Sequence, residues 1–179
     1  AGKSTLLSVA AGIERQDAGK IELAPLGRGQ LGYVPQEIAL YPALTGMQNL
    51  RFFASAAGLY GRRRTIRCRY LLEKVNLADK ADKPVSTYSG GMQRRVAIAR
   101  ALAYGEQHRG EVVYLFDEPL KGLDEQTAGE VLEVIRTQTA GSLSFFITHD
   151  REEAQRLSDV IVCFAGPPLQ VTQVIDNRK

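Results

Sequence analysis

The chain has 179 residues, of which 44% are hydrophobic and 24% charged, values that suit one globular domain with a core of its own. Its net charge of +3 is too small to indicate nucleic acid as a partner. The basic cluster within residues 62–69 predicts a solvated helix face rather than a lipid- or RNA-binding patch. No apolar stretch approaches the roughly 20 residues of a membrane span.

The first half of the chain predicts short strands followed by a mainly helical region. The expected elements are a helix over residues 4–11, strands over 21–23 and 31–34, a helical insertion from 46 to about 77, and a helix over 92–102. Gly12 is placed to end the first helix, and apolar residues of the insertion repeat at helical spacing.

The second half predicts strands that alternate with helices. Residues 112–116 form a continuous apolar run, as expected for a parallel strand that is buried on both faces. A helix over 125–139 and buried strands over 143–147 and 160–164 follow. This alternation predicts an α/β domain with a mainly parallel sheet.

The two cysteines give no sign of a zinc site or a disulfide framework. Cys68 and Cys163 are far apart in the sequence and form no C-x-x-C pair, so a reducing cytoplasm is the expected compartment. Cys163 lies in an apolar run and is expected to be a core residue.

Gly2-Lys3-Ser4-Thr5 opens the first helix and matches the end of the phosphate-loop pattern G-x-x-x-x-G-K-S/T. In such a loop, backbone N–H groups hold phosphate, the lysine reaches the β/γ oxygens and the serine hydroxyl ligates Mg²⁺. The first glycine of the pattern would lie upstream of Ala1. The pattern alone is a short motif that also occurs by chance.

Ionisable side chains follow two of the expected strands. Asp117 and Glu118 come directly after the first, at the strand end where open α/β sheets bind ligands. Asp117 would complete an Mg²⁺ shell, and Glu118 would polarise an attacking water as a general base. His149 follows the second strand, either as a structural histidine or as a contact to a γ-phosphate.

Ser89, Gly90 and Gly91 stand directly in front of the helix expected over 92–102. One interpretation is structural: a serine caps the helix and glycines make the turn before it. The other is an anion site, formed by a hydroxyl and free N–H groups at a helix start.

Six short motifs occur in order along the chain. They are Gly2-Lys3-Ser4-Thr5, Tyr33-Val34-Pro35-Gln36, Ser89-Gly90-Gly91-Met92-Gln93, Leu115-Phe116-Asp117-Glu118-Pro119, Gly122-Leu123-Asp124 and Thr148-His149-Asp150. Their order and spacing resemble the nucleotide-binding domain of ATP-binding cassette (ABC) transporters over essentially the whole chain.

The resemblance implies a P-loop NTPase fold with a mainly parallel sheet core. Residues 1–179 would be one ATPase domain, with residues 38–102 as an inserted helical subdomain. ATP and Mg²⁺ are the implied cofactors, and the implied activity is ATP hydrolysis that powers transport through a separate transmembrane permease subunit. A head-to-tail dimer with itself or a homologous ATPase subunit is implied, without nucleic acid, in the cytoplasm on the inner face of the cell membrane.

The resemblance also assigns roles to single residues. The implied catalytic residues are Glu118, His149 and Gln36, and the implied metal ligands are Ser4, Asp117 and Gln36. The implied nucleotide contacts are Ala1, Gly2, Lys3, Ser4 and Thr5 within the chain, and Ser89, Gly90, Gly91, Met92 and Asp124 across the dimer.

Several positions depart from the family pattern. Tyr88 and Met92 stand where leucine and glutamine are usual, and Leu120-Lys121 replaces small polar residues. None of these changes removes a group assigned to the chemistry. The adenine-stacking aromatic, the first strands and the start of the phosphate loop would precede Ala1, so we expect residues 1–179 alone to bind ATP very weakly and hydrolyse it negligibly.

Alternatives remain within and outside this family. Residues 44–53 and 88–92 look most like exporters of the drug-resistance (ABC-2) type, whereas 120–124 is also similar to some importers. A cassette ATPase acting on nucleic acid or ribosomes is a rival from another class. In the chromosome-maintenance and repair ATPases of that class, a long coiled coil separates the phosphate loop from the Ser-Gly-Gly signature motif. Here Lys3 and Ser89 are only 86 positions apart, without sustained heptads. An inactive gene fragment is a third alternative.

Overall fold

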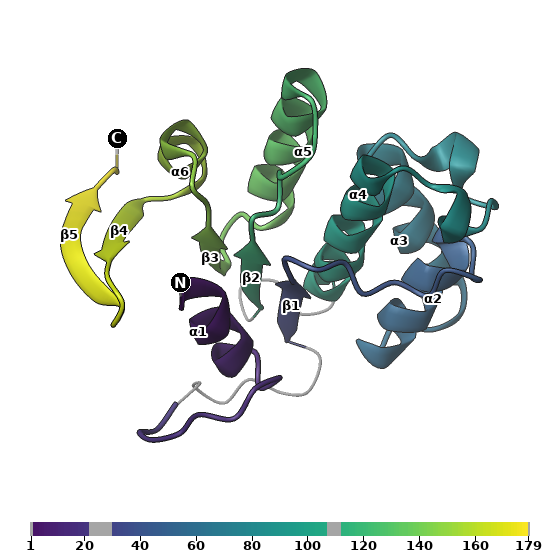
Figure 1. Cartoon of the computed structure of the whole chain (residues 1–179). Coiled ribbons are helices and arrows are strands. Elements are labelled where there is room, and N and C mark those ends of the chain that lie inside the picture. Colours follow the sequence, from purple (N-terminus) through teal and green to yellow (C-terminus); the bar gives the residue numbers. More distant parts are fainter. Residues whose placement is uncertain (1, 22–29, 107–111, 179) are drawn as a thin grey trace.

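A computed structural model describes residues 2–21, 30–106 and 112–178 of the chain. The helices are α1 (Lys3–Ala10), α2 (Gly46–Ala56), α3 (Gly61–Lys74), α4 (Gly90–Leu102), α5 (Glu125–Gln138) and α6 (Arg151–Leu157), with short 3-10 turns η1 (Ala78–Lys80), η2 (Val85–Thr87) and η3 (Ala103–Glu106). The strands are β1 (Leu31–Val34), β2 (Val113–Asp117), β3 (Leu143–Ile147), β4 (Val160–Ala165) and β5 (Gln170–Asp176) (Figure 1). Ala1 and most of the strand expected over 21–23 lie outside the described residues.

Strand β2 is the centre of a three-stranded parallel sheet with the order β1-β2-β3. Its side chains alternate between the two faces, as they must in an extended strand. Tyr114 and Phe116 belong to the main core with residues of α4 and α5, whereas Val113 and Leu115 pack with Leu7 of α1. The predicted parallel strand that is buried on both faces is therefore confirmed.

A glycine in β1 lets helix α4 approach the sheet closely. A Cβ atom on Gly32 would lie 2.6 Å from the Tyr114 ring and 2.8 Å from the carbonyl oxygen of Ala101. Neither neighbour leaves room for that atom, so β1 needs glycine at this position. The same tight packing buries the Tyr114 phenol, and burial raises the pKa of Tyr114 to about 12.

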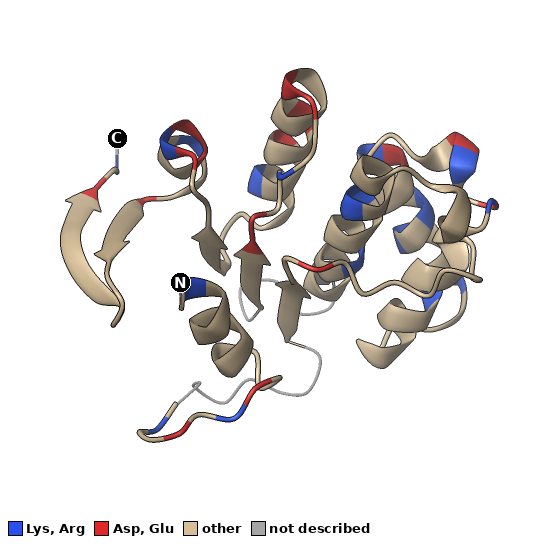
Figure 2. Ribbon diagram, viewed as in Figure 1, with Lys and Arg blue, Asp and Glu red and all other residues tan. Residues whose placement is uncertain are grey.

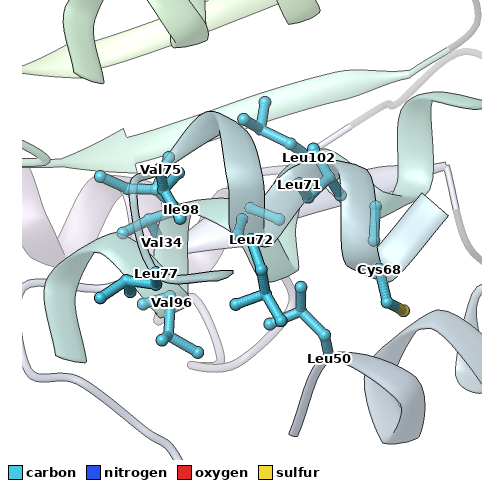
Figure 3. Close-up of a cluster of buried hydrophobic side chains, with 14 of the residues drawn as sticks. Val34, Leu50, Cys68, Leu71, Leu72, Val75, Leu77, Val96, Ile98 and Leu102 are labelled. Carbon is cyan, nitrogen blue, oxygen red and sulfur yellow. The ribbon is translucent and has the colours of Figure 1, made fainter. Parts of the chain in front are cut away.

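The helices α2 and α3 pack on α4, beside the sheet rather than over it (Figure 1). Their apolar faces meet α4 in one continuous core, shown in Figure 3. Leu50, Leu71, Leu72 and Ile98 are fully buried in it. Helix α2 begins with a capping box, in which Thr45 and Gln48 each accept a backbone N–H of the other. These helices fall within residues 38–102, and their treatment as a separate subdomain stays a prediction.

The expectation that residues 160–164 form a buried strand of the parallel sheet is wrong. Strand β4 was expected to be buried in the parallel sheet, but it pairs antiparallel with β5 in a separate two-stranded sheet. Val160 and Val162 are 47% and 42% exposed, and Cys163 is only half-buried. The apolar run predicts a strand, whereas its burial depends on long-range neighbours that the run does not specify.

Strand β3 is also less buried than expected. It lies at the edge of the parallel sheet among the described strands, where β2 is its partner. Leu143 and Phe145 on one face are 58% and 48% exposed. On the other face, Phe146 stacks on Phe116 with ring centroids 4.8 Å apart.

Helix boundaries are close to the predicted ones, with one informative difference. Helix α4 begins at Gly90 rather than residue 92, so both glycines belong to its first turn and do not form a turn before it. No helix among the described residues is long and apolar enough to span a lipid bilayer.

The shared core of α2, α3 and α4 generates a stability prediction. Leu72→Ala removes a fully buried side chain and is expected to lower the free energy of unfolding by about 2–5 kcal/mol, because a cavity remains. Leu143→Ala removes the same atoms from a side chain that is 58% exposed and is expected to cost less than about 1 kcal/mol. Urea unfolding of both variants measures the difference, and equal losses would contradict this description of the core.

Candidate active site

Glu118 is the point on which three distant parts of the chain converge. It follows β2, and its backbone N–H donates to the carbonyl of Ile147 at 2.8 Å. Its carboxylate accepts from Gln36 Nε2 at 3.4 Å and lies 3.1 Å from His149 Nε2. Lys121 Nζ is 2.7 Å from Glu118 Oε2. Three residues predicted from separate motifs therefore lie in one cluster.

The backbone at Glu118 is strained, and its carboxylate is ionised. The residue has φ of 48°, a left-handed conformation that costs free energy for a side chain other than glycine. The hydrogen bond and charge of Lys121 lower the pKa of Glu118, helped by His149 and Arg94, against the opposing effect of burial. The carboxylate side chain is only 12% exposed, so its negative charge is held close to the Lys121 ammonium.

Asp117 stands at the end of β2 with an unused acceptor. The residue is 1% exposed, and its Oδ1 is buried without a hydrogen-bond partner among the described residues. A buried carboxylate oxygen without a donor suits a hard cation such as Mg²⁺, which prefers oxygen ligands. Within residues 2–21, 30–106 and 112–178, no group of three or more His, Cys, Asp or Glu residues gathers. A cation at Asp117 would therefore need hydroxyl, amide, phosphate or water oxygens as its other ligands.

Arg94 was not predicted from the sequence, although it ties the site together. It is 6% exposed, and its guanidinium donates to the carbonyls of Pro35 at 2.9 Å and Gln36 at 2.7 Å. Burial lowers the pKa of Arg94, while Glu118 and Asp117 act against that shift. The bonds fix the segment that carries Gln36 to α4. One feature of the sequence could have indicated the role of Arg94: it is a charged residue in a helix that is otherwise rich in buried apolar residues.

The start of α1 contains the phosphate-loop residues. Gly2 is the N-cap with φ of 101°, and Lys3, Ser4 and Thr5 form the first turn. The N-terminal end of this helix is directed to the side toward which the arrowheads of β1, β2 and β3 point (Figure 1). Among the described residues, no hydrogen bond or ion pair joins Lys3 or Ser4 to Asp117 or Glu118. Ala1 lies outside the described residues.

At the start of α4, Ser89 has the capping role that the structural interpretation predicts, whereas Gly90 and Gly91 lie inside the helix. Ser89 Oγ accepts the backbone N–H of Met92 at 3.2 Å and so caps the helix. Gly90 and Gly91 carry no side chain, and a Cβ on Gly91 would lie 3.2 Å from Leu123. Helix α4 therefore begins against the turn that follows β2. The Met92 side chain packs on the main core.

Asp124 ends that turn and caps α5. Its side chain accepts the backbone N–H of Thr127 at 3.0 Å, and this bond lowers the pKa of Asp124. The loop from β2 to α5 thus places Glu118, Lys121 and Asp124 within one short segment, opposite the start of α4.

This arrangement defines a class of protein. A parallel sheet with an acidic pair at a strand end, a Gly-Lys-Ser-Thr helix start and a capped Ser-Gly-Gly helix beside it is the nucleotide-binding domain of ATP-binding cassette proteins. The family profile described as "ABC transporter" matches residues 1–121, and the chain belongs to that family.

Individual relatives agree with this assignment. The linearmycin resistance ATP-binding protein LnrL of Bacillus subtilis is 36% identical over 170 residues, which cover 90% of this chain and 53% of LnrL. The taurine import ATP-binding protein TauB of Pseudomonas aeruginosa is 34% identical over 180 residues, which cover 96% of this chain and 66% of TauB. The chain thus spans about half the length of LnrL and about two-thirds of TauB.

A solved structure shows the same fold. The dimeric, post-hydrolysis structure of the ATP-binding cassette MJ0796 bound to ADP and Pi superimposes with a TM-score of 0.80 at 25% sequence identity. The match covers 99% of this chain and 82% of that one. The predicted P-loop NTPase fold is therefore confirmed.

The buried guanidinium generates a prediction about stability. Arg94→Leu leaves the carbonyls of Pro35 and Gln36 without their donors and is expected to lower the free energy of unfolding by about 2–4 kcal/mol. Arg136 also makes two charged hydrogen bonds, to Glu133, but on the surface. Arg136→Leu is expected to cost at most about 1 kcal/mol. Urea unfolding compares them, and a smaller loss for Arg94→Leu would refute the role of the buried contact.

Proposed function

We propose that the chain is the ATP-binding and ATP-hydrolysing part of an ABC transporter and powers a separate membrane subunit. The observation that carries this proposal is the convergence of Gln36 and His149 on the Glu118 carboxylate. The names of LnrL and TauB as ATP-binding proteins support it. So does the bound ADP and Pi in the MJ0796 structure.

Each residue around Glu118 has a separate role in ATP hydrolysis under this proposal. The ionised Glu118 accepts a proton from the attacking water. His149 contacts the γ-phosphate, and Gln36 orients the water through its amide. Lys121 keeps the carboxylate in place between turnovers, because its ammonium is 2.7 Å from Glu118 Oε2.

The phosphate groups would be held at the start of α1. Free backbone N–H groups at this helix start would donate to phosphate oxygens, and Lys3 would reach the β/γ oxygens. Mg²⁺, when bound, neutralises charge on those oxygens. Ser4, Gln36 and Asp117 would hold it, and the buried, unpartnered Oδ1 of Asp117 supports this assignment.

Ser89, Gly90, Gly91, Met92 and Asp124 would act across a head-to-tail dimer, on nucleotide held by the partner's phosphate loop. The dimeric state of MJ0796 supports such an assembly. Ser89, Gly90 and Gly91 are accessible at the start of α4, where the helix dipole favours an anion.

The face of α2 and α3 is suited to the membrane subunit. A groove of about 590 Å³ lies there, lined by Leu44, Gln48, Arg51, Phe52, Ser55, Ala56 and Arg64. Phe52 and Tyr41 are 51% and 47% exposed and contact each other edge to face at 5.1 Å. Exposed aromatic groups beside a groove are typical of protein interfaces. This docking would hold the chain on the cytoplasmic side of a membrane.

Transport direction and substrate are properties of the membrane subunit in this proposal. LnrL is named for resistance and TauB for import, yet both resemble this chain at similar identity. The residues around Glu118 act on ATP, and the chemistry at that site is the same in either direction.

Glu118 gives the decisive test of hydrolysis. In the complete transporter, Glu118→Gln is expected to keep ATP binding while lowering the steady-state ATPase rate by about 10²–10⁴-fold, because the amide accepts no proton. Glu73→Gln, at an exposed position of α3, is the matched control and should leave the rate unchanged. A Glu118→Gln rate within about threefold of the unmodified protein would refute the assignment.

Ser89 tests the proposed dimer. Ser89→Arg is expected to leave the ATP affinity of a monomer nearly intact but to abolish ATP-dependent dimers, because the side chain fills space that the γ-phosphate needs. Size-exclusion chromatography with ATP, in a Glu118→Gln background, measures dimer formation. Gln173→Arg on exposed β5 introduces the same side chain elsewhere. Normal dimers with Ser89→Arg would show that this helix start does not complete a partner's site.

A further inference from the structure

Residues 38–72, which include α2 and most of α3, carry charge of one sign. No Asp or Glu occurs between Glu37 and Glu73, whereas six arginines lie in that stretch: Arg51, Arg62, Arg63, Arg64, Arg67 and Arg69. Since the whole chain has a net charge of only +3, the remainder of the chain is net negative. Positive charge is therefore concentrated on α2 and α3, and blue segments mark these helices in Figure 2.

Half of these arginines are used inside the fold. The hydrogen bonds join Arg51 to Thr65, Arg64 to Ser55, and Arg67 to Gln138 and the Leu102 carbonyl. These contacts hold α3 against α2, α4 and α5. The guanidinium groups of these three arginines therefore bond within the fold and are left out of the surface considered next.

The other three arginines face outward. Arg62, Arg63 and Arg69 are exposed, and in the described part of the chain none of them forms an ion pair. Ile66 lies among them at helical spacing and is 57% exposed. Tyr60, which precedes the helix, is 67% exposed. We name these five residues the α3 patch.

We propose that the α3 patch binds the anionic headgroups of a lipid bilayer. Guanidinium groups donate to lipid phosphates, and each basic residue at the surface strengthens the attraction. The Ile66 side chain enters the boundary of the acyl chains, and the Tyr60 ring lies at headgroup level. The proposal rests on the proposed function only in that a membrane subunit would bring the chain beside a bilayer.

The apolar centre of the patch favours lipid over other polyanions. An exposed isoleucine gains nothing from a phosphodiester backbone, and single-stranded nucleic acid is held mainly by several aromatic platforms. The sequence alone favours a solvated face for this cluster. The structure adds that its three outward arginines form no ion pair with a described carboxylate and surround an exposed apolar side chain.

Flotation with lipid vesicles tests the proposal directly, without nucleotide or membrane subunit. The chain is expected to bind phosphatidylcholine vesicles that contain about one-third phosphatidylglycerol at least about 100-fold more strongly than pure phosphatidylcholine vesicles. Replacing Arg62, Arg63 and Arg69 together by glutamine should weaken this binding by roughly 100-fold, at about fivefold for each arginine. Added salt should weaken it as well.

A matched variant separates the patch from net charge. Replacing the exposed Arg15, Arg151 and Arg156 by glutamine removes the same charge from other surfaces, and should change vesicle binding by less than about threefold. Ile66→Ser is expected to weaken binding several-fold while leaving the charge unchanged. Circular dichroism confirms that each variant is folded.

Three results would overturn the proposal: no preference for anionic vesicles, an equal loss in both triple variants, or arginine-dependent binding of RNA or an acidic peptide without vesicle binding. The last result would assign the patch to another polyanion. Because nucleotide is absent, failure of this test leaves the Glu118 prediction intact, and failure of the Glu118 prediction leaves this one intact.

Discussion

Strand β2 packs apolar side chains on both of its faces, and the positions of the reactive groups follow from that burial. Leu115 contacts the α1 side while Phe116 contacts the α4 side. The strand therefore cannot shift by one residue without reversing every side chain. Its register with β3 is fixed as well, since Asp117 lies opposite Ile147. Asp117 is thus held at the end of the sheet with a buried oxygen to which no described residue donates, and Glu118 follows in a strained conformation.

Arg94 connects this fixed strand end to the helical region. Its two bonds to the backbone of Pro35 and Gln36 tie the segment after β1 to α4, the helix that Ser89 caps. The Gln36 side chain then reaches Glu118. A movement of α4 would consequently displace Gln36 relative to the carboxylate. The fold provides a physical link between a site for nucleotide and the helices proposed to contact the membrane subunit.

Much of the fold and of the candidate site could be predicted from the local sequence. What could not be predicted depends on contacts between residues far apart in the chain. The apolar run of β2 and the polar residues that follow it predicted both the strand and the position of Glu118. Strand β4 has a similar apolar run, yet it is half exposed, because burial depends on which distant strand lies beside it. The contacts of Arg94 were missed for the same reason, since both acceptors are backbone carbonyls nearly sixty positions away. The catalytic roles of Gln36, Glu118 and His149 stay predictions, although their proximity is now visible.

Charged side chains differ in their partners between the site around Glu118 and the outer surface of α3. Around Glu118, Lys121 lies beside the carboxylate and Arg94 donates to a backbone carbonyl, so both cations have partners within the site. On α3 the outward arginines form no ion pair with any residue that the structure describes, so within that part of the chain only solvent or another molecule can supply their partners. Neighbouring like charges on one helix face repel each other and oppose helix formation. The buried contacts of Cys68, Leu71 and Leu72 offset that repulsion, which allows the face to remain cationic in the folded chain.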